Sequence, residues 1–145
     1  MNKGIGVLLR DGAAAVDAEI QAALAEQGFD EIQPGHHTLL RHLGEDGARP
    51  SELAAKAGVT RQAVTKTLDD LERLDLVVRE PDPADGRGVV VRYTPRGLAG
   101  LQVARNCMNQ IERRFASDVG GQRWRTVRDV LEALFDAAGA SRPHS

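Results

Sequence analysis

The chain has 145 residues, which is enough for one domain with a hydrophobic core of its own. Its 19 basic and 21 acidic side chains give a formal net charge of −2, which excludes a uniformly basic surface. No apolar run approaches the roughly 18 residues of a membrane span, and the single cysteine, Cys107, excludes an internal disulfide. Because residues 1–17 also lack the long apolar stretch of a signal peptide, we expect a cytoplasmic protein.

The first predicted element is a helix within residues 5–27. Val16, Ile20 and Leu24 recur there at helical spacing, which gives the helix one apolar stripe. Gly28 directly follows and is a plausible C-terminal stop, since glycine tolerates the left-handed conformation that often ends a helix.

The charge of the chain changes sign after this region. Residues 1–48 carry three basic side chains against eight acidic ones, a net charge of −5. Residues 49–66 carry four basic side chains against one acidic one, a net charge of +3. This asymmetry favours a localised contact with an anionic partner, with the acidic region turned away from it.

The most informative segment, residues 49–97, has the pattern of two short helices, a tight turn and a charged hairpin. Ala54 is small enough for two helices to cross closely, and Gly58 can adopt the left-handed conformation that ends the first of them. Val64 returns to the core from the second helix. Two helices joined by a plain turn can show this spacing by chance. The predicted β-hairpin that follows favours a helix-turn-helix, whose second helix enters the DNA major groove.

The second helix separates into an apolar and a polar face. Val64, Leu68 and Leu71 share the apolar stripe, and Thr60 is a good N-cap. The opposite face carries Gln62, Thr65, Lys66, Asp69 and Arg73. Such a face can be merely solvated, but amide and cationic groups directly after the turn suit base edges and phosphates. We expect Asp69 to pair with Arg73, four residues later.

The hairpin is predicted from two short β-branched runs, residues 76–79 and 89–93, around the turn-forming sequence PDPADGRG. Arg87 near its tip fits a DNA minor groove, and Asp85 is expected to hold the tip or to orient Arg87. The alternative is a surface ion pair between the two, worth little. The predicted DNA-binding residues are Arg49, Thr60, Arg61, Gln62, Thr65, Lys66, Arg73, Asp85 and Arg87.

The hairpin resembles the wing signature of the MarR family: Asp-x-Arg, five residues, an apolar residue, Thr, two residues, Gly. The matching residues are Asp85, Arg87, Tyr93, Thr94 and Gly97. Residues 51–77 are similar to the family's helix-turn-helix, and residues 32–43 to the helix before it. Two positions depart from the pattern: Asp75, where the family usually has Gly, and Tyr93, where it usually has Leu. Asp tolerates the left-handed conformation better than most residues, so the turn can survive.

The resemblance implies a mainly α fold with a small β wing (α+β), a winged helix-turn-helix with flanking dimerisation helices. It implies a single domain over residues 1–145, with a DNA-binding region at 33–96 and helical dimerisation regions at 1–32 and 97–145. A long helix after Gly97 is predicted to stop at Gly120-Gly121. A final helix follows and carries the apolar residues Trp124, Val127, Val130, Leu131, Leu134 and Phe135. These terminal helices carry more apolar surface than a winged helix alone can cover. The resemblance implies a homodimer, and the alternative is a monomer whose terminal helices cap its own core.

We therefore expect a DNA-binding transcriptional regulator, a repressor of nearby genes that binds a pseudo-palindromic double-stranded operator. The resemblance implies release by a small, often aromatic, ligand, with Phe29, His36 and His37 as the predicted pocket. The alternative is a winged helix used only for protein contact or dimerisation, which the basic face disfavours. We expect no enzymatic activity, no cofactor and no metal, since the histidines lack a second ligand set at suitable spacing. Cys107 is expected to be passive and buried, an oxidant-sensing thiol being the alternative.

Overall fold

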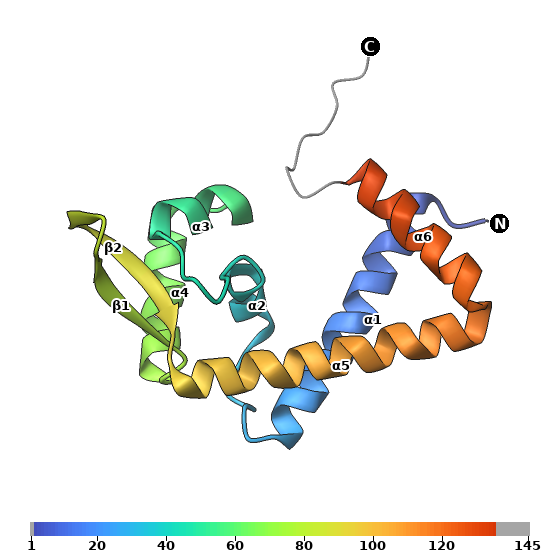
Figure 1. Cartoon of the computed structure of the whole chain (residues 1–145), viewed down its shortest axis with the longest axis horizontal. Helices are drawn as coiled ribbons and strands as arrows, with labels where there is room; N and C mark the ends of the chain where they lie inside the picture. The colour runs from blue at the N-terminus through green and yellow to red at the C-terminus, as the bar shows by residue number, and fades with distance from the viewer. Residues whose placement is uncertain (1, 136–145) are drawn as a thin grey trace, which may run out of the picture. The chain divides into compact units, whose positions relative to one another are not determined.

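The computed structural model describes residues 2–135 and gives the predicted winged helix-turn-helix pattern (Figure 1). Its elements are α1 (Ile5–Glu26), α2 (Pro34–Leu40), α3 (Pro50–Ala57), α4 (Arg61–Arg73), β1 (Val77–Asp82), β2 (Asp85–Tyr93), α5 (Pro95–Val119) and α6 (Gly121–Leu134). The fold class predicted from the sequence is confirmed: helices dominate, and the hairpin supplies the strands. The chain divides into two compact units between Cys107 and Met108, within α5.

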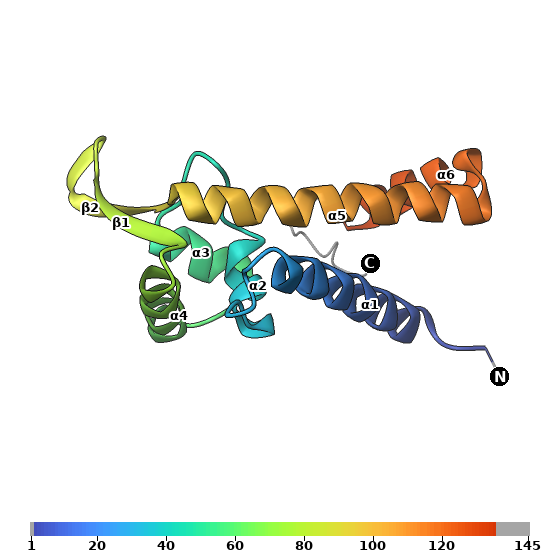
Figure 2. The same ribbon diagram turned by 90° about the horizontal axis from the view of Figure 1, so that it is seen from below.

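The first unit has its hydrophobic core between α2, α3, α4 and the hairpin, which lie together in both views (Figures 1 and 2). The predicted apolar stripe of α4 forms the centre of this core. Val64 and Leu68 are 1% exposed and Leu71 is fully buried, beside Leu53 of α3 and Val91 of β2. Burying a large aliphatic side chain contributes about 1.5–3 kcal/mol, so this stripe fixes which face of α4 remains outside.

The turn between α3 and α4 forms for the predicted reasons. Gly58 has φ 67° and ψ 33°, the left-handed conformation that ends α3. The N–H of Val59 then donates to the carbonyl of Ala54 at 3.1 Å. Thr60 begins α4, and its hydroxyl accepts a hydrogen bond from the N–H of Ala63 at 3.1 Å. The turn thus satisfies backbone groups at both helix ends and fixes the start of α4.

The other end of α4 closes through Asp75, one of the two departures from the family pattern. Asp75 has φ 56°, so it does adopt the left-handed conformation, as expected. The N–H of Leu76 reaches back to the carbonyl of Leu71 at 3.0 Å and closes the turn. The chain can therefore pass directly from α4 into β1.

The start of α5 is fastened to this turn by the Thr94 and Gly97 of the wing signature. The N–H of Thr94 donates to the carbonyl of Leu76 at 3.1 Å, and its hydroxyl donates to the carbonyl of Asp75 at 2.5 Å. The same hydroxyl accepts from the N–H of Gly97 at 3.0 Å. A Cβ at Gly97 would lie 1.9 Å from the Leu76 carbonyl oxygen, so only glycine fits there.

The hairpin is antiparallel, with Val77 opposite Tyr93, and an irregularity between Pro81 and Asp82. Its strands extend nearer the tip than the predicted runs 76–79 and 89–93. The predicted strands are too short because residues 82–88 contain Asp, Gly and Pro, which are poor strand formers. A further pair of hydrogen bonds, 2.8 and 3.0 Å long, joins Val91 to Ala48 and forms an isolated antiparallel β-bridge beside the hairpin.

The second unit contains the end of α5 and α6. The predicted stop is confirmed: α5 ends at Val119, and Gly120 has φ 93° before α6 begins. Phe115 and Trp124 pack edge to face with ring centroids 5.2 Å apart. The final helix begins three residues before Trp124 and ends at Leu134, so Phe135 lies just past its end. None of the helices within residues 2–135 is long and apolar enough to cross a membrane.

Candidate nucleic-acid interface

The exposed face of α4 lies opposite its buried stripe. It presents the predicted residues Arg61, Gln62, Thr65, Lys66, Asp69 and Arg73, all exposed. The hydroxyl of Thr65 donates to the carbonyl of Arg61 at 3.0 Å, so its oxygen can still accept a hydrogen bond. Because the core anchors the opposite stripe, this face is held in one orientation.

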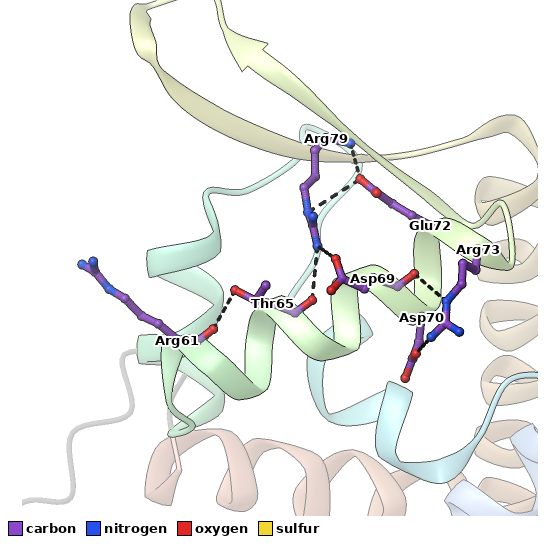
Figure 3. Close-up of polar contacts among 7 residues, drawn as sticks. All are labelled: Arg61, Thr65, Asp69, Asp70, Glu72, Arg73 and Arg79. Carbon is purple, nitrogen blue, oxygen red and sulfur yellow. Dashed lines mark hydrogen bonds and ion pairs between the residues drawn. The ribbon is translucent and has the colours of Figure 1, made fainter.

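The predicted pairing of Asp69 with Arg73 is wrong. Arg73 instead pairs with Asp70, three residues earlier, and its Nε donates to the backbone carbonyl of Asp69 at 3.4 Å (Figure 3). The Asp69 carboxylate accepts a hydrogen bond from the Arg79 guanidinium at 2.7 Å. The helical spacing alone suggested Asp69 and Arg73, but β1 folds back along α4 and supplies a competing cation.

Arg79 makes several contacts that tie β1 to α4, and sequence reasoning missed it. Its guanidinium also donates to the carbonyl of Thr65 at 3.2 Å. Its backbone N–H donates to Glu72 Oε1 at 3.1 Å, and its Nε lies 3.6 Å from the same oxygen. The only signal in the sequence was a cation inside a β-branched run, which gave no hint of its partners.

The base of the wing tip is fixed by Asp82, whose side chain is 8% exposed. Asp82 Oδ1 accepts from the N–H of Ala84 at 2.9 Å, and Oδ2 pairs with the Arg49 guanidinium. The Ala84 N–H, and then Arg49, lower the pKa of Asp82, against burial, which raises it. Arg49, a predicted DNA contact, therefore also joins the start of α3 to the wing.

The tip itself carries Asp85 and Arg87. Asp85 Oδ1 accepts from the backbone N–H of Arg87 at 3.1 Å. This short-range bond holds the backbone of the turn, in the manner of an Asx turn, and does not engage the guanidinium. Both residues are exposed. The arrangement projects the Arg87 side chain from a tip whose backbone is held by its neighbour.

A surface depression of about 330 Å³ lies between α3, α4 and β2. It is lined by Arg49, Pro50, Ser51, Arg61, Val64, Thr65, Gly88 and Val89. Three of the predicted DNA-binding residues, Arg49, Arg61 and Thr65, thus meet at one place. Two guanidinium groups and two hydroxyls around a concave surface suit an oxyanion such as a backbone phosphate.

The predicted pocket residues contact different elements. Phe29 is buried in the first unit, with the Arg96 guanidinium 5.0 Å above its ring centroid. His36 lies 3.8 Å from Asp70 of α4, and burial lowers its pKa.

His37 instead faces α1. Its Nε2 lies 2.7 Å from Gln21 Oε1. Burial lowers the pKa of His37, although Asp17 acts to raise it. Within residues 2–135, no group of three or more His, Cys, Asp or Glu side chains is placed to hold a metal ion.

The fold and this basic face define a winged helix-turn-helix protein. The model of the MarR family matches residues 31–88, which include the helix-turn-helix and the wing tip. An HTH-type transcriptional repressor of Mycobacterium tuberculosis is 29% identical, over 90% of this chain and 92% of the relative. Over residues 31–88 the chain is therefore similar to the MarR family.

Solved structures share this fold. The transcriptional regulator Tm0710 from Thermotoga maritima is 27% identical with a TM-score of 0.61, over 89% of each chain. CouR from Rhodococcus jostii RHA1, bound to p-coumaroyl-CoA, is 23% identical with a TM-score of 0.70, over 93% of this chain and 94% of CouR. CouR bound to a 23-mer DNA duplex is 24% identical with a TM-score of 0.68, over 90% and 92% of the two chains.

Proposed function

We propose that this chain is a DNA-binding transcriptional regulator that represses nearby genes from a pseudo-palindromic operator. One observation carries the proposal. The exposed face of α4 is polar and basic, follows the Gly58 turn in the chain, and precedes a wing with Arg87 at its tip. The mycobacterial relative is named a repressor, and CouR was solved on DNA. Such a role requires no catalysis and places the protein in the bacterial cytoplasm, where the DNA is.

Each exposed group of this surface has a role in the proposal. Gln62 and Lys66, in the first two turns of α4, contact base edges in the major groove, because amide and ammonium groups match the hydrogen-bonding pattern there. Arg87 enters the neighbouring minor groove. The remaining predicted residues position the backbone phosphates or the elements that contact them: Arg49, Thr60, Arg61, Thr65, Arg73 and Asp85.

The regulator is proposed to act as a homodimer through its terminal helices. Val127, Val130 and Leu134 of α6 are 43–66% exposed and recur at helical spacing, and so form an apolar stripe. On α1, Ile5 and Leu8 are 68% and 51% exposed. A second copy that covers these stripes would also place two recognition helices about 34–36 Å apart, one DNA turn.

A small ligand is proposed to release the DNA. The CouR structure with p-coumaroyl-CoA supports a ligand-responsive regulator, and Phe29, His36 and His37 remain the proposed ligand contacts. Burial lowers the pKa of His36 and of His37. Both imidazole groups are therefore neutral near pH 7 and can accept or donate hydrogen bonds without a net charge.

The proposal is tested by Gln62→Ala, assayed on DNA from the chain's own promoter region and on random DNA of equal length. We expect a loss of about 1–3 kcal/mol on the operator, equivalent to about 5- to 150-fold, with random DNA almost unaffected. Gln102→Ala is the matched control, because it removes the same amide from an exposed position of α5.

Two outcomes contradict this proposal. Equal losses on operator and random DNA would show that Gln62 does not contact base edges. Absence of wild-type binding to any promoter fragment would instead favour a winged helix that contacts only protein.

A further inference from the structure

Arg79 is a side chain of the wing that contacts two successive turns of α4. It lies on β1, yet its polar groups bond to Thr65, Asp69 and Glu72 of α4 (Figure 3). These three partners span two turns of the helix. The Arg79 side chain is 29% exposed, which protects the network partly from water.

The position of Asp69 requires an explanation. Its side chain is 56% exposed on the face of α4 that the proposed function directs at DNA. A free carboxylate there would repel phosphates and weaken binding. Asp69 is bound to Arg79 at 2.7 Å, so its charge is both compensated and used to hold the wing strand.

Asp70, the next residue, provides a contrast. It pairs with Arg73 within α4 and lies 3.8 Å from His36 of α2. Its described contacts reach no part of the wing. The two neighbouring carboxylates on one helix therefore differ in whether they connect that helix to β1.

We propose that Arg79 is a positioning residue for DNA recognition, which acts through Asp69 to keep the wing at a fixed place relative to α4. With the wing so held, Arg87 and the base-contacting face of α4 meet the same half-site together. Binding then requires less ordering of the wing, which lowers its entropic cost. The inference rests on the proposed DNA-binding function.

The first test uses Asp69→Ala, because two explanations predict opposite signs. If Asp69 acts only through its charge, its removal strengthens operator binding, since a repulsive carboxylate is lost. If it positions the wing through Arg79, its removal weakens binding by roughly three- to tenfold. Asp70→Ala is the matched control and is expected to leave affinity unchanged or raise it. Tighter binding by Asp69→Ala would overturn the inference.

A double-mutant cycle identifies the wing as the route. The loss caused by Asp69→Ala should shrink strongly when Arg87→Ala has already removed the tip contact. Arg79→Lys should lie between wild type and Arg79→Ala, because an ammonium can pair with Asp69 but cannot reproduce the planar fork. Fully additive losses of Asp69→Ala and Arg87→Ala would overturn the inference.

Amide hydrogen exchange without DNA separates this inference from the proposed function. Asp69→Ala should speed exchange at residues 77–93 and leave α1 unchanged, whereas Asp70→Ala should alter neither. Faster exchange in the hairpin, with no binding of wild type to DNA, would contradict the proposed function but would still show that the Arg79–Asp69 pair holds the wing against α4. Unchanged exchange in the hairpin would show that the Arg79–Asp69 pair does not hold the wing, and would overturn the inference.

Discussion

Replacement of Gly97 by alanine should destabilise the first unit through a single methyl group. That methyl would lie 1.9 Å from the Leu76 carbonyl oxygen, whereas real Cβ atoms keep at least 3.0 Å from their neighbours. The two backbones must therefore separate by more than 1 Å. Both are main-chain segments, so no side-chain rotation relieves the contact.

The magnitude follows from the hydrogen bonds that hold this joint. Separation weakens the two bonds from Thr94 to the carbonyls of Leu76 and Asp75, and the bond that its hydroxyl accepts from Gly97. Each contributes about 1 kcal/mol net. Alanine recovers about 1 kcal/mol in helix propensity. We expect a net loss of about 2 kcal/mol, which lowers the Tm by roughly 4–8 °C for a chain of this size.

Chemical and thermal unfolding, followed by circular dichroism, measure this loss. Gly35→Ala is the control: Gly35 is also helical, and a Cβ there would meet nothing within 4 Å. That variant should match wild type or gain up to about 1 kcal/mol. A Gly97→Ala protein as stable as wild type would refute the reasoning.

Two further substitutions test the proposed contacts. Arg87→Ala should weaken operator binding without a change in Tm, and should make the salt dependence shallower by about one ion per subunit; binding equal to wild type at every salt concentration would show that the wing does not touch DNA. Leu134→Asp, at a side chain that is 66% exposed, should leave the fold intact but shift sedimentation from dimer to monomer and weaken DNA binding. A wild-type chain that sediments as a monomer at micromolar concentration would refute the dimer.

Local chemistry made much of the fold predictable. Gly58, Thr60 and Asp75 each act through their own backbone or a residue three positions away, so the sequence around them is sufficient. The apolar stripe of α4 was equally visible, because helical periodicity repeats along one element. The exact ends of the hairpin were not, because Asp82 and Asp85, which pair with each other at the ends of the strands, are poor strand formers.

The candidate site was predictable in composition but not in its connections. Residue types and the turn located the exposed face of α4, which requires no knowledge of other elements. The partner of Asp69 depended on how β1 folds back along α4, ten residues further on, and helical spacing favoured the wrong cation. Arg49 shows the same limit: its partner Asp82 lies 33 residues away. Long-range ion pairs leave no periodic pattern in a sequence.

The contacts at the start of α5 couple this helix to the end of α4. Arg96, in the first turn of α5, donates to the carbonyl of Leu74 at 2.7 Å and to that of Gly28 at 3.3 Å, while its guanidinium covers Phe29. Thr94 binds the same end of α4 through Asp75 and Leu76. A displacement of the first turn of α5 must therefore carry the end of α4 with it or break these bonds. Because Phe29 is a proposed ligand contact, a ligand that shifts its ring acts directly on the residue that joins α5, the α1–α2 turn and the recognition helix.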